Sequence, residues 1–343
     1  MLNDNISLLI RRIRFPLMLG VLLIHSSNIA LVPGGTPGVD AALSLEKFMN
    51  SVMLDPIVPL FFFISGLLNL KESNFMRKGY AAFLKKRFAT LLVPFVLWNI
   101  LAFAIRNVIK IIPFTRQFCD SQALDAPSFW SLFVAPELVP MWFIRNLLLL
   151  LAFAPLIWYI LRKLRWFGLV LLFFVDISSA YLAGIFYFGL GQLLRDGLNR
   201  TAPERLTMVL RIISGSWLTV VALCLVFTLF FPEIRPGVPA FPREVLLACL
   251  TVGGLAFYAL WFGRIEVPGA LASSAFFIYA FHGIISPYVN KIVTKAVDPQ
   301  AFLTVMLSYA LDFVLVAIVS VALYFLMKKV FPRTLGLLTG SRA

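Results

Sequence analysis

Charged residues are scarce in this chain of 343 residues: they make up 13% of it, whereas 61% of the residues are hydrophobic. A soluble globular domain typically has about 25% charged and about 45–50% apolar residues. The mean hydropathy is accordingly high, at +0.92. So much apolar surface cannot be buried inside one globular core, and repeated apolar stretches make lipid the expected solvent. The composition therefore excludes an ordinary soluble domain.

Cysteine is also rare. The three cysteines, Cys119, Cys224 and Cys249, show no spacing typical of a disulfide framework or a zinc cluster. We therefore expect small buried side chains and no metal site. The sequence also has no repeat period, no low-complexity tract and no long polar segment. These absences predict one integral-membrane domain that covers residues 1–343.

Apolar runs predict an all-α, polytopic transmembrane helix bundle of about ten spanning helices, since about 20 apolar residues are needed to cross a bilayer. The predicted spans are 14–32, 51–70, 88–112, 140–161, 166–178, 180–194, 212–231, 244–262, 270–289 and 302–327. The two short spans between residues 166 and 194 are expected to form a tight pair, so a count of about eight to about eleven stays open. Residues 33–40 and 232–242 are rich in proline and glycine and are predicted to be turn-rich caps.

Basic residues outnumber acidic ones, which gives the chain a net charge of +14. Such a charge can attract nucleic acid, but most of the 30 basic residues lie in short segments on one side of the predicted spans. That is the positive-inside pattern of membrane proteins, so we predict no nucleic-acid partner. The pattern predicts a multi-pass protein of the inner (plasma) membrane with both termini cytoplasmic. Residues 71–87 are then cytoplasmic, and residues 113–139 face outward.

The two histidines are informative because a polar side chain in hydrocarbon is costly and usually serves a function. His25 and His282 both fall inside predicted spans. Arg14 precedes His25 by eleven residues, which make about three turns plus ~20°, so both side chains lie on one helix face about 16 Å apart. A cytoplasmic cation is thus aligned with a base in mid-membrane. Coenzyme A has a similar layout, with phosphates at one end and the thioester at the other. Alternatively, Arg14 is a topology anchor and the histidines pack between helices.

Four segments carry a resemblance to a known family. The first is Arg14 and His25 with ten residues between them. The others are residues 59–66 (PLFFFISG), 142–147 (WFIRNL) and 276–282 (FFIYAFH). In this order, spread over nearly the whole chain, they resemble the R-x10-H, PLFFFISG, WFL and FFIYLFH motifs of the acyltransferase-3 family. The members of this family are membrane-bound, acyl-CoA-dependent O-acyltransferases.

The resemblance implies an enzyme, an acyltransferase that transfers groups other than aminoacyl groups. It implies an acyl group, usually acetyl, taken from cytoplasmic acyl-CoA as donor substrate, with no permanently bound cofactor. The acceptor is then a hydroxyl of a cell-envelope glycan or a lipid-linked sugar. Arg14, Lys86 and Arg87 are the residues expected to bind acyl-CoA. One position departs from the family pattern, because Thr90 stands where a second arginine often follows this basic cluster.

Histidine has the unperturbed pKa that suits a base acting on a hydroxyl near neutral pH, so His25 is the predicted general base. His282 is expected to orient the acceptor or to donate to the oxyanion. Further candidates for the acceptor or oxyanion site are Ser65, Trp142, Arg145, Asn146, Tyr279 and Asp312. Alternatives stay open for these residues. Ser65 and Gly66 are equally explained as small residues that let helices approach, and Ser65 could instead form an acyl-enzyme. Arg145 either faces the acceptor cleft or reaches outward to the interface.

Other functions are compatible with polar residues in mid-membrane. One is a secondary transporter, or a flippase-like export component for polysaccharide precursors. The sequence shows no pair of corresponding helices interrupted by glycine or proline, which would point to the inverted repeats of such proteins. A non-catalytic subunit of a polysaccharide export assembly is a third alternative.

Overall fold

A computed structural model describes residues 4–69, 77–111, 134–136, 138–230 and 240–340. The predicted outward loop 113–139 and the predicted cap 232–242 lie almost entirely outside these residues, as does Cys119.

The described residues are helical, and no β-strand occurs among them. The α-helices are α1 (Asp4–His25), α2 (Pro37–Phe48), α3 (Ile57–Asn69), α4 (Arg77–Arg87), α5 (Val93–Ile111), α7 (Trp142–Leu164), α8 (Trp166–Ser178), α9 (Ile185–Arg200), α10 (Pro203–Phe230), α11 (Ala240–Phe262), α12 (Gly269–Val297), α13 (Phe302–Val330) and α14 (Pro332–Thr339). Short π-helical turns, η1 (Met49–Met53) and η3 (Phe88–Leu92), and a 3-10 turn, η5 (Val139–Met141), join some of them. The predicted all-α membrane bundle is confirmed.

Seven helical runs among the described residues are long and apolar enough to cross a membrane. They are Pro37–Leu68, Gly79–Ile111, Val139–Leu164, Pro203–Val226, Glu244–Phe262, Gly269–Val297 and Phe302–Val330. The remaining three predicted spans correspond to α1, which carries three arginines near its start, and to the short helices α8 and α9. The expected short pair is present, joined by the turn between Ser178 and Ile185.

Some helix boundaries differ from the prediction. α2 begins at Pro37, inside the stretch predicted as a turn-rich cap, because the Thr36 side chain accepts a hydrogen bond from the Val39 N–H and proline suits the first helical position. The basic cluster before the third span is helical, since α4, η3 and α5 follow one another without a break. α1 begins ten residues earlier than predicted and ends at His25, where the polar run from Ser26 to Asn28 starts.

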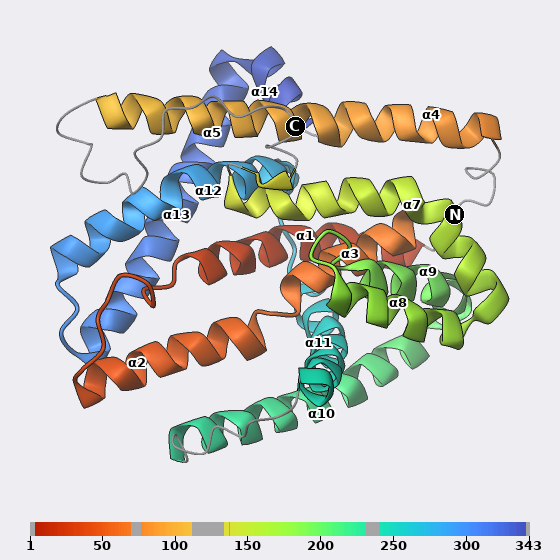
Figure 1. Cartoon of the computed structure of the whole chain (residues 1–343), viewed down its shortest axis with the longest axis horizontal. Helices are drawn as coiled ribbons and strands as arrows, with labels where there is room; N and C mark the ends of the chain where they lie inside the picture. The colour runs from red at the N-terminus through yellow and green to blue at the C-terminus, as the bar shows by residue number, and fades with distance from the viewer. Residues whose placement is uncertain (1–3, 70–76, 112–133, 137, 231–239, 341–343) are drawn as a thin grey trace.

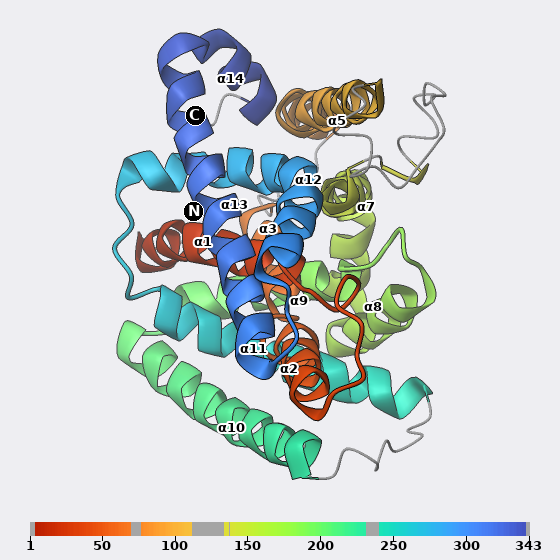
Figure 2. The ribbon, with the colours of Figure 1, turned by 90° about the vertical axis from the view of Figure 1, so that its left-hand side faces the viewer.

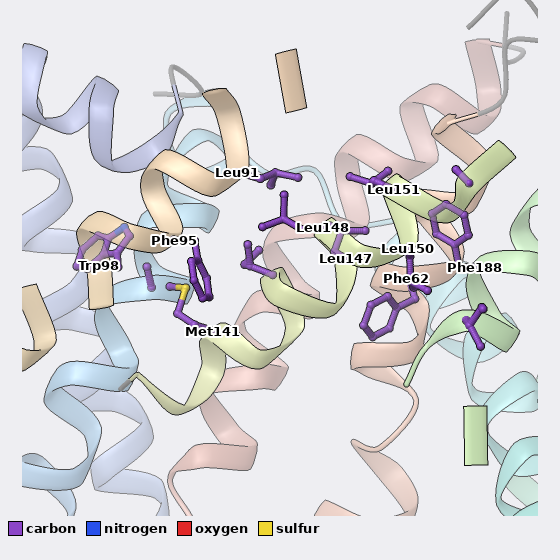
Figure 3. Packing of buried hydrophobic residues seen from close by; sticks show 14 of the residues in the cluster. Phe62, Leu91, Phe95, Trp98, Met141, Leu147, Leu148, Leu150, Leu151 and Phe188 are labelled. Carbon is purple, nitrogen blue, oxygen red and sulfur yellow. The ribbon is translucent and has the colours of Figure 1, made fainter. Parts of the chain in front are cut away.

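Many residues of one large buried apolar cluster come from α7. Figure 1 shows α4 and α5 as one long rod across the top, with α7 running in roughly the same direction beneath it. Figure 2 shows α14 beside α5, and the indole N–H of Trp98 donates to the Leu338 carbonyl oxygen at 2.9 Å. In Figure 3 the leucines of α7 point toward Leu91 on one side and Phe62 on the other. All three groups belong to one buried apolar cluster.

Two glycines bring α3 and α9 into backbone contact. A Cβ added at Gly66 would lie 2.0 Å from the Phe188 carbonyl oxygen, and one at Gly191 would lie 2.2 Å from that of Phe63. No larger residue fits at either position, which is typical of close helix pairs in membranes. The close helix approach expected of the small residues Ser65 and Gly66 is therefore made at Gly66.

Candidate functional site

A cavity of about 440 Å³ lies between α1, α3, α7 and α12, with the end of α4 at its margin. Six of the predicted site residues line it: Arg14, His25, Ser65, Arg87, Trp142 and Tyr279. The rest of its surface is mostly apolar and includes Leu91 and Leu151, which are visible in Figure 3. A long, largely apolar cavity with a few polar groups is the usual form of a small-molecule site.

Two arginines form a basic end of the cavity. Arg14 comes from α1 and Arg87 is the last residue of α4, and their guanidinium groups are close enough to repel each other. Arg87 also lies over the Phe83 ring, 5.2 Å from its centroid. Neither arginine has a carboxylate within ion-pair distance among the described residues. Two neighbouring cations without an acidic partner are arranged to bind an anion, such as a phosphate group.

The two histidines lie together although they come from distant parts of the chain. Their ring centroids are 5.0 Å apart with an interplanar angle of 47°. His25 lines the cavity about 16 Å along α1 from Arg14. His282 is only 1% exposed and does not line the cavity, so it lies behind His25. This placement differs from the direct contact with the acceptor that was expected of His282.

The hydrogen bond of His282 fixes its tautomer. Its Nδ1 lies 3.1 Å from the carbonyl oxygen of Ile278. A carbonyl only accepts, so Nδ1 carries the proton and Nε2 is left with a free lone pair. Nε2 is buried and has no hydrogen-bond partner among the described residues. The neutral His282 is therefore suited to accept a hydrogen bond from the imidazole beside it, and not to donate one to an oxyanion.

Polar contacts hold the end of α1 in place at His25. The Ser286 hydroxyl donates to the His25 carbonyl oxygen at 3.1 Å, and the Asn290 amide donates to the Ser27 carbonyl oxygen at 3.0 Å. Glu46, which is fully buried, accepts from the Asn28 backbone N–H at 2.8 Å and from the Asn28 side chain at 3.0 Å. The general-base candidate thus sits at a helix end fastened to α12 and α2.

The remaining cavity-lining candidates are held in different ways. The Ser65 hydroxyl donates to the Phe61 carbonyl oxygen at 2.8 Å, one turn back along α3. The Tyr279 hydroxyl donates to the Pro140 carbonyl oxygen, which occupies its proton and links α12 to η5. The Trp142 ring packs against Phe62 and Phe143. The hydroxyl protons of Ser65 and Tyr279 are thus both bound to backbone carbonyls, and the indole N–H of Trp142 is the lining donor that no hydrogen bond among the described residues occupies.

Four other predicted residues do not line the cavity. Lys86 is exposed, and Asp312 is fully buried in α13. Arg145 donates to the Val134 carbonyl oxygen at 2.7 Å and lies over the Tyr181 ring at 4.6 Å, so it does not reach outward from its helix. Asn146 donates to the Ala180 carbonyl oxygen at 2.8 Å. Arg145 and Asn146 therefore connect α7 to neighbouring backbone segments, and neither contacts the cavity.

Two residues were missed at the level of the sequence. Ser273 lines the cavity, and its hydroxyl lies 2.8 Å from that of Tyr324. Its signal was the Ser273-Ser274 pair in an otherwise apolar helix start. Glu46 was missed because the predicted second span began only at residue 51. A lone acidic residue in an apolar stretch could have pointed to it.

Comparison with known families gives one match: a family model described as an acyltransferase domain matches residues 10–328. No curated protein and no solved structure matches the chain.

Proposed function

Because this chain belongs to the acyltransferase-3 family and is a membrane acyltransferase, we propose that it moves an acyl group, most often acetyl, from cytoplasmic acyl-CoA to a hydroxyl of a cell-envelope glycan or lipid-linked sugar. The observation that carries the proposal is the shared cavity: Arg14, Arg87 and His25 all line it. Arg14 and Arg87 can bind the phosphates of acyl-CoA, and His25 can lie beside the thioester at the other end of the donor.

Donor binding uses the cationic end. Arg14 and Arg87 have no acidic partner among the described residues, so the phosphates of coenzyme A supply the missing negative charge. The apolar walls between them and His25 suit the slender pantetheine arm. The thioester carbonyl then lies beside the imidazole. Lys86, which is exposed and outside the cavity, takes no part in this contact.

His25 acts as the general base. Its imidazole takes the proton of the acceptor hydroxyl while that oxygen forms a bond to the thioester carbonyl carbon. The tetrahedral intermediate collapses as the carbon–sulfur bond breaks, and the coenzyme A thiolate receives the proton from His25. Trp142 donates a hydrogen bond to the oxyanion in between, or Ser65 does so after its hydroxyl turns away from the Phe61 carbonyl. Atoms and charges balance without an acyl-enzyme.

His282 positions His25 in this scheme. Its buried Nε2 has no partner among the described residues and lies against the His25 ring. In the proposed reaction this nitrogen comes to accept a hydrogen bond from one His25 ring nitrogen, and the other nitrogen of His25 is the base that faces the cavity. A buried neutral partner can also stabilise the imidazolium that forms during the reaction. The pair acts as a unit, with His25 in contact with substrate and His282 behind it.

The acceptor approaches the end of the cavity opposite Arg14. The donor fills the cationic end, so the acceptor hydroxyl reaches His25 from the other side of the bundle. This arrangement fits transfer across an inner (plasma) membrane, with both chain termini cytoplasmic and with membrane lipid and a glycan or lipid-linked sugar as partners. Acetyl is proposed as the acyl group because it is the group that members of this family usually transfer.

The test is release of coenzyme A by the purified protein supplied with acetyl-CoA and an envelope glycan extract. We expect thiol release by the parent protein and loss of it in His25→Ala, with acyl-CoA binding retained. Mass spectrometry of envelope glycans, with and without the protein, then identifies the acylated product. A parent protein that moves glycan across vesicles without releasing thiol would establish the transporter alternative and overturn the proposal.

A further inference from the structure

A second cavity lies on the other side of α1. It has a volume of about 290 Å³ and is lined by residues of α1, α9, α10 and α11 and of the turns that follow α9 and α11. No residue lines both this cavity and the one that contains His25. Arg12 lines the second cavity, and it precedes Arg14 by two residues, or about 200° around the helix. The body of α1 therefore separates the two sites.

The charged residues that line this cavity are all basic. Arg12 from α1, Arg211 from α10 and Arg264, which follows α11, all line it, and no lining residue is acidic. Arg12 is bound to Glu266 at 2.5 Å, at the edge of the cavity. Arg211 and Arg264 have no carboxylate within ion-pair distance among the described residues. Three cations from three segments thus converge on a space that contains a single acidic neighbour.

The remaining wall is apolar. Leu9, Leu206, Leu210 and Leu260 line the same cavity as the arginines. Figure 2 shows α11 between α1 and α10, so these leucines come from packed neighbouring helices. A small hydrophilic anion would leave such a wall without a partner. A ligand with a charged head and an apolar chain matches both parts of the lining.

The position along the bundle matches the membrane surface. Arg12 lies thirteen residues before His25, about 20 Å along α1. The sequence predicts that His25 lies at mid-membrane. Because the hydrocarbon core of a bilayer is about 30 Å thick, that depth would put Arg12 at the level of the lipid headgroups. Trp261, which is 47% exposed and lies under the Arg264 guanidinium at 5.0 Å, is typical of the interfacial aromatic belt.

We propose that this cavity binds one anionic glycerophospholipid from the leaflet on the side of the chain's N-terminus. The phosphate lies among Arg12, Arg211 and Arg264, and the start of an acyl chain lies against the leucines. Basic pockets between transmembrane helices are suited to such headgroups. The bound lipid would brace α1 on the face opposite the reaction cavity. The inference rests on this cavity alone and does not depend on the proposed reaction.

The experiment is a lipid titration of the purified full-length protein followed by native mass spectrometry. Phosphatidylglycerol is expected to bind as a single adduct at low concentration, and phosphatidylcholine is not. The double variant Arg211→Gln/Arg264→Gln should bind phosphatidylglycerol about 30-fold more weakly. The matched control Arg200→Gln/Arg205→Gln removes the same charge from exposed residues nearby that do not line the cavity. It should bind as the parent does.

A second variant tests the apolar wall without a change of charge. Leu206→Trp fills the cavity and should abolish the adduct while the protein stays monodisperse. Equal binding of phosphatidylcholine, or equal weakening in the control pair, would overturn the proposal in favour of nonspecific lipid contact. Displacement of the lipid by inorganic phosphate at equal concentration would also overturn it, since the site would then take free phosphate.

Discussion

Replacing His282 by phenylalanine separates a positioning role from a direct contact with substrate. Phenylalanine keeps a flat ring of similar size against His25 and Tyr279, whose ring centroids lie 5.0 and 6.2 Å from that of His282. The substitution removes both ring nitrogens, including the buried Nε2 that has no partner among the described residues. Because His282 does not line the cavity, its loss can affect transfer only through the lining residues that it contacts, and of these His25 is the proposed base.

The size of the effect follows from the hydrogen bond that the unpartnered His282 Nε2 is proposed to accept from His25 during the reaction. A hydrogen bond to a charged group contributes about 1.5–3 kcal/mol, and His25 becomes charged when it takes the acceptor proton. Since about 1.4 kcal/mol corresponds to a factor of ten in rate, His282→Phe should slow transfer about 10- to 100-fold. His25→Ala removes the base itself and should slow transfer by about 10² to 10⁴.

The assay is thiol release from acetyl-CoA by the two single variants and the double variant, with donor affinity measured by calorimetry. Groups that act as a unit are non-additive, so His25→Ala/His282→Phe should be as slow as His25→Ala alone. Donor affinity should not change in any of the three. If the double variant is instead slowed by the product of the two single effects, His282 acts independently of His25 and the positioning role is wrong.

Three further predictions concern the donor, the end of α1 and the topology. Arg14→Ala should weaken acyl-CoA binding in calorimetry, and Arg14→Lys should restore part of it, because lysine keeps the charge but loses the planar fork. The control Lys86→Ala, outside the cavity, should bind acyl-CoA as the parent does. Unchanged affinity in Arg14→Ala would make Arg14 a topology anchor. Glu46→Gln places an amide against the Asn28 donors and should cost about 1–3 kcal/mol, seen as a lower unfolding temperature in detergent; an unchanged temperature would mean that this contact does not hold the segment after His25. Cysteines placed in residues 113–139 should be labelled only from outside the cell, and labelling only from inside would reverse the orientation.

The fold was predictable from apolar runs because lipid allows few alternatives to a helix. Each of the ten predicted spans has a helical counterpart in the structure. Helix boundaries were less predictable where the same residues are common both in turns and at helix starts, as with Thr36 and Pro37. The Thr36 side chain caps a helix only because the following residues pack as α2. That packing depends on the tertiary structure and cannot be read from the local composition.

The candidate site was predictable only along a single helix. Arg14 and His25 could be placed on one face because both lie on α1, and both line the same cavity. The partnership of His25 with His282 depends on how α1 packs against α12, which spacing within either helix does not reveal. The surroundings of Arg145 were unpredictable for the same reason, since its guanidinium donates to the Val134 backbone carbonyl, and spacing within α7 does not show that this segment lies close.

The end of α1 at His25 has an electrostatic consequence. The aligned peptide groups of a helix place partial negative charge at its C-terminus, which favours a cation there by about 0.3–1 kcal/mol, and by up to about 2 kcal/mol where the site is partly buried. His25 is the last residue of this 22-residue helix. The helix therefore favours the imidazolium over the neutral ring, and in the proposed reaction this charge forms when His25 takes the acceptor proton. The field of α1 acts on the reacting state and leaves the resting one almost untouched.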